Sequence, residues 1–330
     1  MSLKNHKILV IGGAGYIGSH VALAFKDAGA SVSVLDNFSS GLRKNITDGI
    51  DLIEGDIQHI GLLADLFSQP WDGVVHLAAL KAAGESMEKP EIYSRQNLIG
   101  TLNLLEAYAA KKDSKFIFSS TAAVYGDPVT LPMGEDHPTN PVNFYGFTKL
   151  AIEGYLEWYH RLRGLRFASL RYFNAAGFDT KGRIKGLETN TQNLVPLVME
   201  VACGQRDHLS VFGDDYDTRD GSGVRDYIHV SDLARGHVAA YQALCQDAPK
   251  LIVNLGAGQG YSVLEILKTA REVSGINIPF KIVGRRDGDP PTLLASVGLA
   301  KELLGWEAQE SDLRSMIQST WDVYRESYGL

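Results

Sequence analysis

The sequence predicts an α/β protein with a doubly wound parallel sheet and a smaller, mixed α/β C-terminal domain. Short apolar runs, typical of strands buried on both faces, alternate with helix-like segments in the first half of the chain. The chain has 330 residues, which is long for one compact domain. We therefore expect one domain at 1–176, to which segments near 225–256 return, and a second domain at 177–330.

The first strand runs into a glycine-rich turn. Lys7–Ile11 is a largely apolar run, Gly12–Gly18 follows it, and the segment 19–28 is helix-like until Gly29. Glycines at such a turn allow the backbone to approach a pyrophosphate, and the N-terminus of the helix supplies oriented N–H donors to that anion. The turn therefore predicts a Rossmann-like nucleotide site, and a tight turn that binds no ligand is the alternative.

A carboxylate ends the second strand. The strand Ser31–Leu35 stops at Asp36, which lies 18 residues after Gly18. A carboxylate at this position can accept hydrogen bonds from both ribose hydroxyls of adenosine, and it would repel a 2′-phosphate. The sequence therefore predicts NAD, rather than NADP, as the cofactor.

The alternation of strands and helices continues to residue 121. The expected elements are, in order, strand Asp51–Ile57, helix 59–68, strand Gly73–Ala79, helix 89–111 and strand Lys115–Thr121. Ligands of open α/β sheets lie at the carboxyl ends of the strands. We therefore expect Asp56 and Ile57 to meet the adenine, and the small residues near 77–79 to allow close approach of the cofactor.

A phenol and an ammonium group stand four residues apart at the start of the next helix. Tyr145 and Lys149 follow the entry signals Pro141 and Asn143. At this spacing the two side chains face the same way. A fixed cation beside a phenol stabilises the phenolate and lowers its pKa from about 10. Tyr145 is therefore a candidate base that acts on an alcohol, although such a pair also occurs as ordinary surface or core residues.

The second domain shows weaker patterns. Its expected elements are a loop at 178–191, helix 193–203, strand 209–213, an acidic loop at 214–223, a strand-like run at 224–230 and strand 251–258. We interpret the acidic loop as solvated rather than as a metal site, because it lacks the spacing of a calcium loop. The basic loop 285–291 reads either as a solvated turn or as part of a clamp, in which Arg225 and Arg286 hold a diphosphate.

Charge and composition exclude several classes of protein. The net charge is −7, and no run of Lys or Arg indicates a nucleic-acid partner. Cys203 and Cys245 are the only cysteines and form no C-x-x-C pair, which favours a reducing compartment. No apolar run of about 18 residues predicts a membrane span, and no secretion signal is recognisable. We expect a cytoplasmic protein without nucleic-acid, membrane or metal partners.

These motifs together resemble those of the extended short-chain dehydrogenases/reductases and, within that superfamily, of the UDP-glucose (UDP-galactose) 4-epimerases. The glycine turn and the Tyr-x-x-x-Lys pair mark only the superfamily. The blocks at 80–86 and 224–230 are more particular to the epimerases. The resemblance covers almost the whole chain, with further matches at 12–20, 116–120, 124–127, 171–174 and 254–258.

The resemblance implies a catalytic trio of Tyr145, Lys149 and Thr121. Tyr145 would be the base at the sugar 4-hydroxyl, and Lys149 would hold the nicotinamide ribose and keep the tyrosine acidic. Thr121, where many relatives have serine, would hydrogen-bond the reacting oxygen. The C4 hydride would move to tightly held NAD and return to the other face of a transient 4-keto sugar, so that UDP is held firmly while the hexose turns over.

The resemblance also implies two sets of binding residues. The expected cofactor set is Gly12, Gly15, Tyr16, Ile17, Gly18, Asp36, Asn37, Asp56, Ile57, Leu77, Ala78, Ala79, Lys81, Asn97, Ser119, Tyr145, Lys149 and Tyr172. The expected substrate set, for a UDP-hexose, is Lys81, Thr121, Phe173, Asn174, Asn193, Leu194, Phe212, Arg225, Tyr227, Arg286, Asp289 and Leu293.

One position sets the size of the accepted sugar in this family. A bulky tyrosine there excludes N-acetylhexosamines and a small residue admits them, whereas this chain has Leu293. We expect poor acceptance of N-acetylated sugars. By analogy with the family we also expect a homodimer, formed through the helices at 89–111 and 145–163.

Other functions remain open at this stage. A 4-epimerase of UDP-glucuronate or of UDP-N-acetylhexosamines is the nearest alternative enzyme. A nucleotide-sugar 4,6-dehydratase is disfavoured, because Ala122 and Ala123 follow Thr121 where an acid and a base would be needed. From another class, a non-catalytic NAD-sensing module would need only the glycine turn and Asp36.

Overall fold

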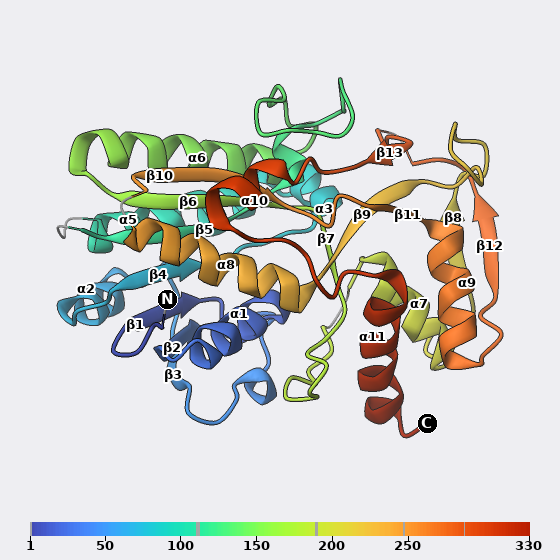
Figure 1. The fold of residues 1–330 in the computed structure, drawn as a ribbon, viewed down its shortest axis with the longest axis horizontal. Helices are drawn as coiled ribbons and strands as arrows, with labels where there is room; N and C mark the ends of the chain where they lie inside the picture. The colour runs from blue at the N-terminus through green and yellow to red at the C-terminus, as the bar shows by residue number, and fades with distance from the viewer. Residues whose placement is uncertain (1, 110–112, 189–190, 247, 287) are drawn as a thin grey trace.

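Seven parallel strands form the central sheet of the protein. The computed structural model describes residues 2–109, 113–188, 191–246, 248–286 and 288–330. The strands follow the order β10-β6-β5-β4-β1-β2-β3 (Figure 1), and every neighbouring pair is parallel. Their bounds are β1 Lys7–Ile11, β2 Ser31–Asp36, β3 Asp51–Glu54, β4 Gly73–His76, β5 Lys115–Thr121, β6 Arg166–Tyr172 and β10 Lys250–Leu255. The predicted doubly wound sheet is confirmed, and its order reverses between β1 and β4, where open sheets bind ligands.

Apolar layers cover both faces of this sheet. Ile8 and Val10 of β1 pack with α1, α8 and α10 on one side, whereas Leu9 and Ile11 pack with α2, α5 and α6 on the other. A strand buried on both faces is apolar at successive positions, which is why β1 is recognisable in the sequence. The bounds of these helices are α1 Tyr16–Asp27, α2 Ile60–Ser68, α5 Gly100–Tyr108, α6 Phe144–Arg163, α8 Val230–Cys245 and α10 Gly298–Leu304. Among the described helices, none is long and apolar enough to cross a membrane.

Some elements have other bounds than the sequence predicts. α1 begins at Tyr16 rather than at Ser19, and β3 and β4 end before Ile57 and Ala79. The last residues of each expected strand leave the sheet and line the cavity described below. The apolar run of β4 continues through Leu77, Ala78 and Ala79, so the sequence does not mark the end of its hydrogen-bonded ladder.

The expected helix 89–111 is divided into three pieces. α4 (Pro90–Tyr93) leads into a π-helical turn, η2 (Ser94–Ile99), and α5 follows. Residues 110–112 lie outside the described chain. Single π-helical turns inside helices occur frequently at functional sites. The turn in this protein carries Asn97, one of the predicted cofactor residues.

The C-terminal half adds two small sheets, which lie beside the carboxyl ends of the central strands (Figure 1). β9 pairs in parallel with β7 and β13 and antiparallel with β11, while β8 and β12 form a separate parallel pair. Helices α7, α9 and α11 enclose an apolar core with these strands. The bounds of the elements outside the central sheet and its helices are η1 Arg43–Asn45, α3 Ala83–Glu88, η3 Ala122–Val124, β7 Asn174–Ala176, α7 Leu194–Ala202, β8 Leu209–Phe212, β9 Val224–His229, β11 Gly260–Ser262, α9 Val263–Ser274, β12 Phe280–Val283, β13 Thr292–Leu293 and α11 Leu313–Tyr328.

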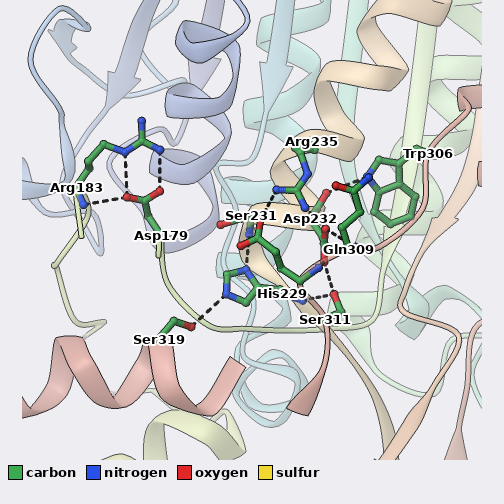
Figure 2. A network of polar contacts seen from close by, with 11 residues as sticks. Asp179, Arg183, His229, Ser231, Asp232, Arg235, Trp306, Gln309, Ser311 and Ser319 are labelled. Carbon is green, nitrogen blue, oxygen red and sulfur yellow. Dashed lines mark hydrogen bonds and ion pairs between the residues drawn. The ribbon is translucent and has the colours of Figure 1, made fainter. Parts of the chain in front are cut away.

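A buried carboxylate fixes the segment before α11 to the first turn of α8 (Figure 2). Asp232 is fully buried and accepts hydrogen bonds from the backbone N–H groups of Gln309 and Glu310, each at 2.8 Å. The hydroxyl of Ser311 donates to the same carboxylate at 2.6 Å, and Arg235 forms an ion pair with it. The C-terminal segment is thereby joined to the helix that covers the central sheet.

Candidate active site

A cavity of about 490 Å³ opens at the carboxyl ends of the central strands. Every predicted cofactor residue except Asn97 lines it: Gly12, Gly15, Tyr16, Ile17, Gly18, Asp36, Asn37, Asp56, Ile57, Leu77, Ala78, Ala79, Lys81, Ser119, Tyr145, Lys149 and Tyr172. Of the predicted substrate residues, the lining includes Lys81, Thr121, Phe173, Asn174 and Asn193. The residues of the predicted trio therefore lie in one cavity with the glycine turn.

The glycine turn is shaped so that only glycine fits. Gly12 has a φ of +80°, and a Cβ on it would lie 2.6 Å from the backbone nitrogen of Ala78. A Cβ on Gly18 would lie 2.1 Å from the carbonyl oxygen of Gly12. The N-cap of α1, Gly15, offers no side chain to its first turn. The N–H groups at this helix end are therefore available to a phosphate, as in other nucleotide sites.

Asp36 fits the ribose of NAD. It is buried at the end of β2, where its carboxylate accepts hydrogen bonds from the N–H groups of Ala14 at 2.9 Å and Phe38 at 2.8 Å. Each carboxylate oxygen keeps a lone pair for a further donor. Beside it, the amide of Asn37 donates to Asp56 at 2.7 Å. The residues at this end of the cavity thus fit an adenosine with free ribose hydroxyls.

Asn97 does not line the cavity but fixes one of its walls. Its side chain accepts from the N–H of Leu80 at 2.9 Å and donates to the carbonyl of Leu80 at 3.0 Å. It also donates to Thr148 on α6 at 3.2 Å. Asn97 therefore joins the loop after β4 to the helix that carries Tyr145 and Lys149.

The predicted trio is assembled between β5 and α6. The ammonium group of Lys149 donates to the carbonyl oxygen of Ser119 at 2.7 Å. The hydroxyl of Thr121 accepts from the N–H of Ala123 at 3.1 Å and hydrogen-bonds the phenol of Tyr145. Lys149 lies 5.8 Å from the centre of the Tyr145 ring. One strand end and one helix face thus hold all three groups.

The acidity of Tyr145 differs from the expectation. Burial raises its pKa to about 12, and the hydrogen bond from Thr121 is the influence that lowers it. Burial also lowers the pKa of Lys149 to about 7, while the nearby carboxylate of Glu153 raises it. The sequence predicts that Lys149 lowers the pKa of Tyr145, whereas in the protein without its cofactor burial of the phenol is the larger influence and Thr121 is the group that lowers the pKa.

The other predicted substrate residues lie outside the lining of this cavity. Leu194, Phe212, Arg225, Tyr227, Arg286, Asp289 and Leu293 belong to the small sheets, the loops around them and the start of α7. Arg225 forms an ion pair with Asp289, and Arg286 lies over the ring of Phe212 with its guanidinium 3.8 Å from the ring centre. The two arginines of the expected clamp are therefore both held in the C-terminal half, and residue 287 of the basic loop lies outside the described chain.

Some residues of the cavity were not predicted from the sequence. Glu188 lines it and forms an ion pair with Lys81, although it falls in a segment read only as a crossing loop, of which 189–190 lie outside the described chain. The remaining additions are Ile11, Leu35, Ser39, Ser40, Gly55, Leu80, Ala82, Glu85, Tyr93, Gln96, Ser120 and Ala175. Within the described ranges, no group of three or more His, Cys, Asp or Glu side chains is placed to hold a metal ion.

The fold and the cavity define a class of protein. A glycine turn at the switch point of a doubly wound sheet, a buried carboxylate after β2 and a buried tyrosine–lysine pair are the parts of a dinucleotide-dependent enzyme that acts on an alcohol. The chain belongs to the NAD dependent epimerase/dehydratase family, which residues 8–256 match. Both the family and the NAD dependence predicted from the sequence are confirmed.

Individual relatives cover nearly the whole chain. The chain is 45% identical to the UDP-glucose 4-epimerase of Halalkalibacterium halodurans, over 97% of this chain and 96% of that protein. The structure is similar to that of UDP-glucose 4-epimerase from Brucella ovis in complex with NAD, with a TM-score of 0.94, 42% identity and coverage of 97% and 98%. It is also similar to the UDP-glucose-4-epimerase of Stenotrophomonas maltophila with bound NAD and formylated UDP-arabinopyranose, with a TM-score of 0.93, 38% identity and coverage of 98% and 99%.

Proposed function

We propose that this protein interconverts UDP-glucose and UDP-galactose by inversion at C4 of the hexose. The observation that carries the proposal is the assembly of Tyr145, Lys149 and Thr121 in the cavity of the glycine turn, in a chain whose near-full-length relatives are UDP-glucose 4-epimerases. An isomerisation of this kind needs no net oxidant, since the hydride taken from C4 returns to C4.

The residues of the trio have complementary tasks. When bound, NAD would supply the acceptor for the C4 hydride. Tyr145, as phenolate, takes the proton of the 4-hydroxyl and returns it at the end of the cycle. Thr121 donates to the oxygen that carries negative charge, and Lys149 binds the ribose and favours the phenolate while it is protonated. These tasks require a pKa of Tyr145 well below the value of about 12 in the protein alone.

The C-terminal half would hold UDP while the sugar turns over. Arg225 and Arg286 are the cations for the diphosphate, and Phe212 beneath Arg286 offers a flat apolar surface to the nucleotide. The pair of Arg225 with Asp289 must open or shift for a bidentate contact with phosphate. Firm binding of UDP and weak binding of the hexose would let the 4-keto sugar present its other face.

The first experiment is incubation of the purified protein with UDP-galactose, without added NAD, followed by NMR of the anomeric protons. Growth of the UDP-glucose signal to a constant ratio is the expected result, and it would also show a resident cofactor that is regenerated in each cycle. No conversion in the presence of added NAD would contradict the proposal and would point to another sugar, with UDP-glucuronate and the N-acetylhexosamines tested next.

We also propose a homodimer in which the α4–η2–α5 segment and α6 face their copies in the partner. Trp158 and Leu162 on α6 are 58% and 75% exposed, and Ile92 and Ile99 on the neighbouring segment are exposed as well. Burial of such apolar side chains favours association. Light scattering should give a mass about twice the 36.0 kDa of one chain, and the Leu162→Glu variant should be a monomer. A monomeric wild-type protein would contradict this.

A cytoplasmic location is proposed on two grounds. UDP-sugars and NAD are intracellular metabolites, and Cys203 and Cys245 are both unpaired in the structure. Unpaired thiols are typical of reducing compartments. Fractionation of the source cells, with antibody detection, tests this directly; recovery of the protein outside the cytoplasm would contradict it.

A further inference from the structure

The face of α6 that carries Tyr145 and Lys149 continues for one more turn to Glu153. These three residues follow one another at intervals of four, so their side chains lie along one stripe of the helix. Each of them contacts one of the last three residues of β5. Tyr145 is hydrogen-bonded to the Thr121 side chain, Lys149 to the Ser119 carbonyl at 2.7 Å, and Glu153 to the Ser120 hydroxyl at 2.5 Å.

Glu153 is held by a second buried group. Its carboxylate accepts from Nε and Nη2 of Arg171 on β6 at 3.1 and 2.7 Å, and both side chains of this pair are 5% exposed. Arg171 also lies over the ring of Tyr125, 4.8 Å from its centre. A charge pair in this position is costly to desolvate, and a hydrophobic pair of similar volume would often be as stable. The Glu153–Arg171 pair is therefore better explained by its effect on the neighbouring catalytic residues than by its contribution to stability.

We propose that Glu153 is a positioning residue for the reaction: through Ser120 it fixes the strand end that carries Thr121 and the acceptor of Lys149, and its negative charge, one helical turn away, acts on the ammonium group of Lys149. The proposal rests on the proposed function, because it assigns a task within that chemistry. Glu153 would act through Ser120 and Lys149 rather than by contact with substrate or cofactor, because it does not line the cavity.

The charges around Lys149 support the electrostatic part. On α6, Tyr145 and Glu153 face it; from β4, His76 is close enough for Lys149 to lower the pKa of its ring. Phe118 of β5 supplies an aromatic face 4.7 Å from the ammonium group, and β6 contributes the positive Arg171 behind Glu153. Glu153 is thus the group that opposes the effect of burial on Lys149, and its loss would leave Arg171 unbalanced.

The test compares Glu153→Gln with Glu157→Gln, the same change one turn further along α6. Glu157 is partly exposed and pairs with Arg161 and Lys250, away from the cavity. For Glu153→Gln we expect kcat with UDP-galactose to fall at least about tenfold, with KM and the amount of bound NAD within about twofold of wild type. The alkaline limb of the pH profile of kcat should move down by about one pH unit, because Lys149 loses its proton more readily. Glu157→Gln should leave all four quantities unchanged.

The outcomes separate the two levels of the proposal. An inactive wild-type protein contradicts the proposed function itself. An active wild-type protein, with a Glu153→Gln variant whose kcat and pH profile are unchanged, contradicts only the role of Glu153, and so does a fall in kcat without movement of the alkaline limb. If Glu153→Gln does not fold, Glu153→Gln/Arg171→Gln removes both buried charges and is judged by the same two measurements, with the same expected directions.

Discussion

At the scale of single residues, the environment of Tyr145 favours the protonated phenol over the phenolate. Burial raises its pKa to about 12, and within the protein the hydroxyl of Thr121 is the group that lowers it. We expect Tyr145→Phe to reduce turnover of UDP-galactose about a thousandfold, because general base catalysis contributes 10²–10⁴-fold and no second base replaces the phenol. Bound NAD, measured after denaturation, should remain within about twofold of wild type.

The same variant distinguishes an enzyme from a sensor. A non-catalytic NAD-binding module would bind NAD equally well with either side chain and would have no turnover to lose. Thr121→Ser is the matched control at the neighbouring position, since it keeps the hydroxyl that hydrogen-bonds Tyr145; its turnover should stay within about threefold of wild type. A Tyr145→Phe variant with substantial turnover would remove Tyr145 from its assigned role.

Leu293 is the second residue whose substitution is informative. It is half-buried on β13 and packs against the cluster that contains Val124, Tyr125 and Phe173, of which Phe173 lines the cavity. Under the proposed assignment of Leu293 to the sugar site, glycine at this position would make room for a larger sugar. We expect Leu293→Gly to raise kcat/KM for UDP-N-acetylgalactosamine, relative to UDP-galactose, by about tenfold or more. Equal relative rates in wild type and variant would show that this side chain does not limit the sugar.

At the scale of the elements, β1 and β6 show what the sequence can and cannot predict. β1 is apolar at successive positions because both of its faces are covered, and this pattern is local. β6 was not predicted, because it carries Ser169 and Arg171, which look like surface residues although both are buried. Arg171 is neutralised by Glu153 on α6, a partner that no local pattern reveals. The contacts of Asn97 with Leu80 and Thr148 are likewise invisible to a local pattern, because they join segments that are distant in the sequence.

The buried carboxylate at the start of α8 gives a prediction at this scale. Asp232 accepts hydrogen bonds from the N–H groups of Gln309 and Glu310 and from the hydroxyl of Ser311 (Figure 2). Removal of the carboxylate leaves these buried donors without their acceptor, so Asp232→Ala should lower the free energy of unfolding by about 3 kcal/mol. Asp322→Ala removes a half-exposed carboxylate of α11 that pairs with Arg325 and should change it by less than about 0.5 kcal/mol. Urea denaturation with NAD in excess measures both, and equal effects would contradict the assignment.

At the scale of the whole molecule, the sequence predicted the sheet and the position of the cavity better than the contacts between the two halves. The order of the central strands follows from general rules for parallel sheets, and the glycine turn marks where they bind a ligand. By contrast, Glu188 forms an ion pair with Lys81, which lies 107 residues earlier in the chain, and β13 pairs with the distant strand β9. Such contacts depend on how the two halves pack against each other, and a short window of sequence does not indicate that packing.

Packing of the whole molecule also buries several histidines, and their burial makes its stability depend on pH. Burial lowers the pKa of His20 and of His237 to about 4 and that of His76 to about 3. In the unfolded chain each ring takes up a proton near pH 6.5, so between pH 6.5 and 4 the unfolded state binds more protons and stability falls as pH falls. Asp226 acts in the opposite direction between pH 6 and 3.8, since burial raises its pKa to about 6. Burial lowers the pKa of His229 as well, so the buried histidines outweigh Asp226 and the protein should lose stability in acid.

The urea midpoint should therefore be lower at pH 5 than at pH 7, and His20 allows the cause to be tested. Its Nε2 accepts from the N–H of Asp179 at 3.0 Å, a bond that a protonated ring cannot make. The contribution of His20 is fully present above pH 6.5 and is lost as pH falls through about 4, and it amounts to about 3 kcal/mol. His20→Gln should lower stability at pH 7 but flatten the dependence on pH, whereas His59→Gln, at an exposed position, should leave the dependence as in wild type. An unchanged pH dependence in His20→Gln would mean that acid acts through groups other than this buried ring.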